Sequence, residues 1–198
     1  MTVIGTVGLP GSGKGEAASV AREHGIPVVT MGDVIRQACR DRGLDPADHH
    51  GAVATRLREE DGPAAIAERS LPLVREALAA HDVVLVDGLR SGVELDAFRE
   101  AFGEAFTLVS IEAPFAVRAE RLADRSRDAS DADLDALEAR DDRELGFGMA
   151  EAMDRADVTI DNTDSLDAFR DRIETLLLGT GPTEESVDEQ TPAVEGER

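Results

Sequence analysis

Apolar runs and helical periodicities alternate along the chain from its first residues to about residue 178. This alternation is typical of βαβ units, in which helices cover a parallel sheet. Short, uninterrupted apolar segments predict strands that are buried on both faces. We assign them to Thr2–Val7, Ile26–Val29, Val83–Val86, Phe106–Ile111 and Val158–Ile160. The pattern therefore predicts a three-layer α/β domain over residues 1–178, with a parallel five-stranded sheet.

Amphipathic segments between these strands predict the helices. They cover Lys14–His24, Asp33–Arg42, Pro63–His81, Pro114–Asp124, Leu134–Asp154 and Leu166–Leu178, with an interruption at Gly146 and Gly148. Between Gly43 and Gly62, turn-forming residues predict an insertion with only a short helix around Val53–Glu60. From residue 179 to 198 the apolar content falls, and Gly, Pro and Glu predict an acidic disordered tail.

The 198-residue chain is strongly acidic: it has 42 Asp+Glu against 21 Lys+Arg, a formal net charge of −21 and a pI of about 4.4. Nucleic acids and anionic membranes are bound by clusters of Lys and Arg, so we expect neither as a partner. Lys14 is the only lysine, and aromatic residues make up 3%. This composition predicts a halophilic, cytoplasmic protein kept in solution by dense carboxylates. The single Cys39 fits a reducing compartment.

A glycine-rich loop separates the first predicted strand from the first predicted helix. It reads Gly8, Leu9, Pro10, Gly11, Ser12, Gly13, Lys14, Gly15 and fits G-x-x-x-x-G-K. Glycines let backbone N–H groups turn inward toward phosphates, the helix adds its positive end, and the lysine reaches the β- and γ-phosphates. The loop therefore predicts ATP binding.

Magnesium coordination must differ from the usual pattern, because Gly15 stands where a Ser or Thr normally follows the lysine. Asp87 ends the third predicted strand, at the sheet edge where P-loop enzymes place an acidic metal ligand. We expect Asp87 to hold Mg²⁺, directly or through water. Ser12 and Glu16 are weaker candidates.

A loop that ends in Gly-Lys-Gly resembles that of the adenylate kinase group of nucleoside monophosphate kinases. Residues 30–36 and 87–90 resemble the group's two acceptor segments, and residues 140–142 resemble the far side of its lid. The resemblance implies that Asp33, Arg36, Arg90 and Arg140 bind the acceptor, with an acceptor-binding insertion at about 31–62. Residues 156–166 resemble the dephospho-CoA kinase segment that passes the adenine, which implies an ATP contact for Asn162.

Arginines cluster at the predicted lid, about residues 121–140. Arg118, Arg121 and Arg125 share one helix face because they are three and four residues apart, and Arg127 follows. We interpret Arg121 and Arg125 as catalytic residues that, with Lys14, meet the charge of the transferring phosphate. The alternative is that these arginines form surface pairs with neighbouring acids.

Over about residues 2–178 the chain resembles an archaeal family of uncharacterised P-loop proteins related to adenylate kinase and dephospho-CoA kinase. We expect a nucleoside monophosphate kinase that uses ATP and Mg²⁺ on a small nucleotide acceptor. Two alternatives stay open: a dephospho-CoA kinase, in which Asp87 or Asp33 takes the proton, and a nucleotide-binding regulator or slow ATPase. The four histidines receive no role, and Phe115 and Phe147 are expected in the core. The identity of the acceptor and the oligomeric state stay open.

Overall fold

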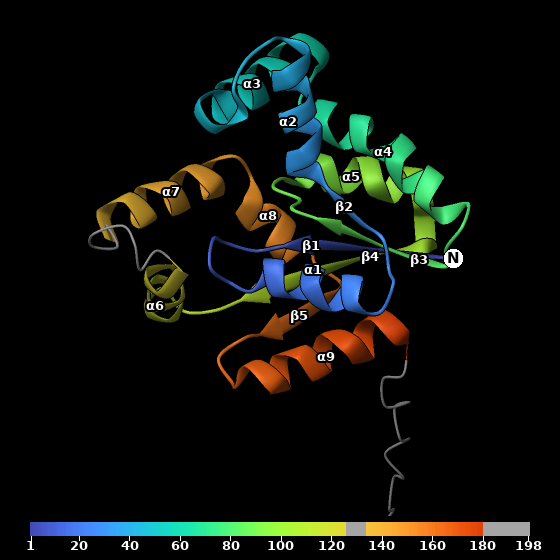
Figure 1. Ribbon diagram of the computed structural model, residues 1–198, viewed down its shortest axis with the longest axis vertical. Helices are drawn as coiled ribbons and strands as arrows, with labels where there is room; N and C mark the ends of the chain where they lie inside the picture. Colours follow the sequence, from blue (N-terminus) through green and yellow to red (C-terminus); the bar gives the residue numbers. More distant parts are fainter. Residues whose placement is uncertain (126–133, 180–198) are drawn as a thin grey trace, which may run out of the picture.

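A parallel sheet forms the centre of the computed structural model, which describes residues 1–125, without the side chain of Arg125, and residues 134–179. Its strands are β1 (Thr2–Val7), β2 (Val28–Thr30), β3 (Val83–Asp87), β4 (Phe106–Glu112) and β5 (Val158–Asp161). They lie in the order β2-β3-β1-β4-β5, and every neighbouring pair is parallel (Figure 1). The predicted five-stranded parallel sheet is confirmed.

Helices cover both faces of this sheet. They are α1 (Lys14–Glu23), α2 (Met31–Asp41), α3 (Pro46–Asp61), α4 (Ala65–Leu78), α5 (Gly92–Phe102), α6 (Phe115–Arg125), α7 (Leu134–Gly146), α8 (Met149–Asp154) and α9 (Leu166–Leu178), with a short 3₁₀ turn, η1 (Gly103–Ala105). Helices α1 and α9 pack on one face, and α4, α5 and α8 pack on the other. The three-layer α/β architecture is therefore confirmed.

Successive residues of the strands enter two separate apolar cores. Val3 and Val7 of β1 lie in the core under α4, α5 and α8, whereas Ile4 lies in the core under α1 and α9. Val84 and Leu85 of β3 divide in the same way. Because side chains alternate between the faces of a strand, burial on both faces requires a continuous apolar run. For this reason the strands could be predicted from continuous apolar runs in the sequence.

The segment before α4 forms a helix of 16 residues, so the prediction of only a short helix around Val53–Glu60 was wrong. The side chain of Asp45 accepts a hydrogen bond from Ala47 N (2.9 Å) and caps α3, with Pro46 in the first turn. Val53 and Leu57 are buried in the same core as α2 and α4. Packing against these neighbours compensates for the weak intrinsic helix preference of this stretch.

Helix α5 was not predicted, although its start carries a recognisable sequence signal. Ser91 Oγ accepts from Glu94 N (3.2 Å), and a carboxylate oxygen of Glu94 accepts from Arg90 N (2.8 Å). Ser-x-x-Glu is the sequence signature of a capping box, and here the Glu94 carboxylate accepts from the N–H of Arg90, the residue before the N-cap Ser91. Leu95 and Phe98 follow and are fully buried.

Helices α6 and α7 lie on the side toward which the strands point, at the left of Figure 1. The middle of the predicted lid, residues 126–133, and the predicted tail beyond Gly179 lie outside the described residues. Within the described ranges, no helix combines the length and the apolar character that crossing a lipid bilayer requires.

Candidate functional site

Close contacts on both sides fix the glycines of the loop between β1 and α1. A Cβ atom at Gly8 would lie 2.3 Å from the carbonyl oxygen of Ile111, and one at Gly13 would lie 2.3 Å from Asn162 Nδ2. Both residues also have positive φ, +150° and +120°, which other residues rarely adopt. Both positions therefore require glycine, and the loop ends at the N-terminus of α1, where free backbone N–H groups favour an anion.

Lys14 begins α1 and turns back over the loop. Its Nζ donates to the carbonyl oxygens of Gly8 and of Leu9, the latter at 3.1 Å. Burial lowers the pKa of Lys14 from 10.5 to about 8; the charge of Asp87 offsets part of this change, and that of Arg90 adds to it. An anion beside this ammonium group would stabilise its charge.

Asn162 and Arg121 brace the loop from behind. The Asn162 side chain is buried, and its Nδ2 donates to the carbonyl oxygen of Ser12 (2.7 Å). Arg121 Nη2 donates to the backbone carbonyl of Asn162 (2.9 Å) and to its Oδ1 (3.2 Å). Both predicted site residues therefore contact the β5–α9 turn or the back of the loop.

Arg118 is a buried link between three segments. It is 4% exposed, and its two terminal nitrogens donate to the two carboxylate oxygens of Asp141 at 3.0 and 2.6 Å. Nη1 also donates to the carbonyl oxygen of Pro10 (3.0 Å). Arg118 thus joins α6, α7 and the loop, and its terminal nitrogens donate to protein oxygens. The predicted partners Arg125 and Arg127 have side chains outside the described part of the chain.

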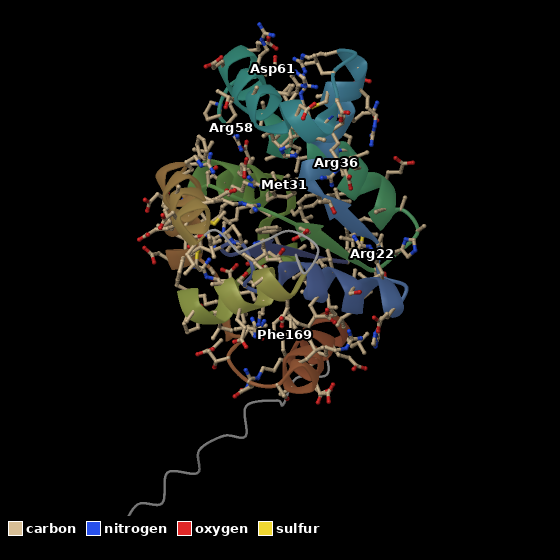
Figure 2. All side chains as sticks on the ribbon, turned by 60° about the vertical axis from the view of Figure 1, so that its left-hand side comes forward. Arg22, Met31, Arg36, Arg58, Asp61 and Phe169 are labelled. Carbon is tan, nitrogen blue, oxygen red and sulfur yellow. The ribbon has the colours of Figure 1, made fainter. Side chains whose placement is uncertain are left out.

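A cavity of about 680 Å³ opens beside the loop, between α2, α3 and α7. Figure 2 shows Arg36 on α2 and Arg58 on α3 above the sheet. The ionisable and aromatic residues of the lining are Lys14, Arg36, His50, Arg58, Asp87, Arg90, Arg140, Arg143, Glu144 and Phe147. Seven of the residues predicted from the sequence therefore line one cavity: Gly8, Pro10, Lys14, Asp87, Arg36, Arg90 and Arg140.

Two arginines of this cavity have no carboxylate partner among the described residues. Arg36 pairs with Asp33 (2.7 Å), Arg58 with Glu94 (3.0 Å) and Arg90 with Glu144 (2.8 Å). Arg140 makes no such ion pair, and Arg143 donates only to the backbone carbonyl of Ala139 (3.1 Å). In a chain with a net charge of −21, these two exposed guanidinium groups lie at the same cavity as the half-buried Lys14 and add positive charge there.

Asp33 and Asp87 occupy different positions. Asp33 is exposed, holds Arg36 and does not line the cavity. Asp87 lines the cavity, where its Oδ1 accepts from Thr6 Oγ1 (3.1 Å). A Cβ at Gly15 would meet open space, so packing does not forbid a hydroxyl residue there. Within the described ranges no group of three or more His, Cys, Asp or Glu could hold a metal.

Comparison with known proteins shows the family to which this chain belongs. The AAA domain model matches residues 7–138. A UPF0200 protein of Halobacterium salinarum is 58% identical over 188 residues, which are 95% of this chain and 98% of the relative. A UPF0200 protein of Methanosarcina mazei is 44% identical and covers 89% and 94% of the two chains. The chain belongs to the UPF0200 family.

Solved structures similar to this UPF0200 chain share its fold. TT1252 from Thermus thermophilus has a TM-score of 0.63 at 21% identity and covers 91% of this chain and 98% of its own. Shikimate kinase from Acinetobacter baumannii has a TM-score of 0.56 at 17% identity, with 92% and 96% covered. A gluconokinase from Sinorhizobium meliloti has a TM-score of 0.55 at 21% identity, with 90% and 93% covered. The UPF0200 chain thus has the fold of P-loop kinases.

Sequence reasoning missed several cavity residues of this UPF0200 chain. Arg143 and Glu144 follow Arg140 by three and four residues on α7, so helical spacing was an available signal. His50 and Arg58 come from α3, which was interpreted as an insertion. Phe147 was expected in the core but is 54% exposed, and the Arg58 guanidinium lies 5.7 Å from its ring centroid. Phe115, at 38% exposure, also departs from the core prediction.

Proposed function

We propose that this UPF0200 chain is an ATP-dependent phosphotransferase of the nucleoside monophosphate kinase type, which moves the γ-phosphate of ATP to a small nucleotide acceptor. One observation carries the proposal: the P-loop lysine shares a cavity with arginines from α2, from the β3–α5 connection and from α7. Phosphoryl transfer depends on positioning and on the neutralisation of charge more than on covalent chemistry. A cavity with cations on several sides suits that reaction.

On the donor side, the loop N–H groups and Lys14 would bind the ATP phosphates, and Asp87 would hold Mg²⁺ directly or through water. The bound ion would bridge phosphate oxygens and offset their charge. Asn162 and Arg121 support this site by fixing the back of the loop, through the Asn162 Nδ2 contact to the Ser12 carbonyl oxygen. Their predicted direct contacts with ATP remain part of the proposal.

On the acceptor side, Arg36, Arg90 and Arg140 would bind the acceptor phosphate. They approach the cavity from three elements, and a phosphate that reaches all of them is fixed in position relative to Lys14. Arginine suits this role because its planar fork of donors matches phosphate oxygens. Arg140 is available at once, whereas Arg36 and Arg90 would exchange a carboxylate partner for the phosphate.

A dephospho-CoA kinase is the second candidate, and the placement of Asp87 is the observation that favours it. A hydroxyl acceptor needs a carboxylate within reach of its proton, and Asp87 lines the cavity whereas Asp33 does not. A regulator or slow ATPase would share the donor site but need no acceptor. In each case we propose a cytoplasmic protein without nucleic acid or membrane partners.

A phosphoryl-transfer screen in concentrated KCl tests the proposal, with MgATP and AMP, CMP, UMP, GMP or dephospho-CoA. We expect acceptor-dependent ADP formation that Lys14→Ala abolishes. Arg36→Ala and Arg90→Ala should raise the acceptor KM by about 10- to 100-fold, as expected for lost hydrogen bonds to a charged group, with a small change for ATP. Arg69→Ala is the matched control, because Arg69 pairs with Asp61 outside the cavity.

The screen also separates the alternatives. Transfer to dephospho-CoA alone would replace the nucleoside monophosphate assignment. ATP hydrolysis that no acceptor changes would favour the regulator or slow ATPase. Equal effects of Arg36→Ala and Arg90→Ala on both substrates would remove the acceptor role of these arginines.

A further inference from the structure

Helix α7 buries a carboxylate that has spare hydrogen-bonding capacity at the cavity wall. Glu144 is 7% exposed and lines the cavity. Its Oε1 accepts from Arg90 Nη1 at 2.8 Å. Its Oε2 is buried and has no hydrogen-bond partner among the described residues. Buried polar atoms are nearly always paired, so an unpaired carboxylate oxygen at a ligand cavity indicates a missing donor.

The surroundings restrict what that donor is. Arg140 and Arg143 lie on the same helix and line the same cavity, and Lys14 faces it from the loop. An anionic ligand group is attracted to these cations and repelled by the carboxylate. A neutral O–H or N–H group would be a favourable partner for Oε2, because hydrogen bonds to ionised acceptors are the strong ones. The cavity therefore presents two chemically different subsites side by side.

We propose that Glu144 is a specificity-determining residue of the acceptor site. Its Oε2 accepts a hydrogen bond from a neutral hydroxyl or amino group of the acceptor, while the arginines hold the acceptor's anionic group. The acceptor class is then a phosphate or diphosphate ester that carries a hydroxyl or amino donor, and a bare inorganic anion is disfavoured. This inference rests on the proposed phosphotransferase function and specifies its substrate.

Glu144→Gln tests this role with little change in shape. The Gln side-chain oxygen can still accept from Arg90. The Gln NH₂ group then takes the place of Oε2, so a hydrogen-bond donor of the protein faces the hydroxyl or amino donor of the acceptor. Isothermal titration in Mg²⁺-free KCl buffer compares sulfate, which has no donor group, with AMP, CMP, UMP, GMP and dephospho-CoA. We expect the best-bound nucleotide to lose about 10- to 100-fold in affinity, as expected for a lost charge-assisted hydrogen bond. Sulfate should bind more tightly, because a negative charge has been removed.

Opposite changes in the affinities for sulfate and for the nucleotide distinguish direct recognition of the acceptor by Glu144 from a purely structural role. If Glu144 only anchored Arg90 and α7, the affinities for sulfate and for the nucleotide would fall together, and the proposal would be overturned. An effect that appears only when Mg²⁺ is added would make Glu144 a metal ligand instead. Glu138→Gln is the matched control, because Glu138 is an exposed residue of α7 outside the cavity lining and should change neither affinity.

Two further outcomes separate this inference from the proposed function. If the wild-type chain bound no nucleotide of the panel more tightly than sulfate, the proposed acceptor class would fail, and the role of Glu144 with it. If the nucleotide bound equally well to Glu144→Gln, only the role of Glu144 would fail. Melting temperatures of both variants, measured beside the wild type, confirm that each chain is folded.

Discussion

Some properties of Lys14 follow from the sequence, and others depend on its surroundings in the folded chain. It is the only lysine of the chain, and it stands at the lysine position of the P-loop motif. These facts follow from the sequence. Its low pKa of about 8 does not, because burial, Asp87 and Arg90 set it, and their distances to Lys14 depend on the folded chain.

The pKa of Lys14 predicts a pH dependence of ATP binding. Phosphate contact favours the ammonium form, so the bound pKa lies above the free value of about 8. Below about pH 8 affinity should be nearly constant in pH. Above it, binding requires uptake of a proton, and Kd should rise by up to about tenfold per pH unit until the bound pKa is reached.

Isothermal titration between about pH 7 and pH 10 measures this profile, which spans the free pKa and approaches that of ordinary lysine. Lys14→Arg keeps a cation that does not titrate in this range, so its profile should be flat. A wild-type profile as flat as that of Lys14→Arg would contradict the assignment of the low pKa to Lys14.

Helix α7 shows why the sequence predicted only part of the candidate site. Its buried positions are Leu137, Asp141 and Glu144, at helical spacing. Hydrophobic periodicity identifies a buried face by its apolar residues, and here two of the three are carboxylates. Their partners, Arg118 and Arg90, lie 23 and 54 residues away in sequence, so no local pattern links them. The P-loop, by contrast, is one continuous segment, so the spacing of its glycines and lysine was sufficient to predict it from the sequence.

The Arg118–Asp141 pair predicts a large stability effect. Asp141→Asn would leave the Arg118 guanidinium buried without a counter-charge, which should lower the free energy of unfolding by about 3 to 5 kcal/mol. ATP affinity should also fall, because Arg118 holds the carbonyl oxygen of Pro10 in the loop. Chemical denaturation measures the first effect and titration the second.

Asp142→Asn provides the control for this pair, because Asp142 is the exposed neighbour on the same helix. Its free energy of unfolding should stay within about 0.5 kcal/mol of the wild type, as is usual for surface positions. Similar losses of unfolding free energy for both variants would show that stability depends on the total charge of α7 and not on the buried Arg118–Asp141 pair.

The molecule as a whole combines an acidic exterior with a cationic cavity. The net charge of −21 excluded polyanion partners in the sequence analysis, yet the proposed ligands are themselves anions. The fold resolves this by gathering Lys14 and five arginines at the cavity beside the carboxyl ends of the strands, where open α/β sheets bind ligands. Elsewhere most arginines with a described partner form exposed pairs, such as Arg69–Asp61.

This charge distribution predicts salt-dependent stability. Carboxylates that repel one another destabilise the compact state, and added ions screen them over a Debye length. The melting temperature should therefore rise between about 0.1 M and 2 M KCl, the higher value reducing the Debye length to a few ångströms. Sucrose at matched osmolality controls for solvent exclusion. A melting temperature that stays constant or falls would contradict both this prediction and the expected halophilic character.

The sequence by itself determined the strands, most helices and the phosphate-binding loop of this protein. Each depends on residues close together in the chain, through apolar periodicity or through glycines that the backbone requires. Only the tertiary structure decided that Arg58 of α3 and Glu144 of α7 line the cavity of Lys14, and that Arg118 donates to Pro10 in the loop and to Asp141. The physical reason is that burial and side-chain pairing depend on the spacing between distant elements, which no local pattern records.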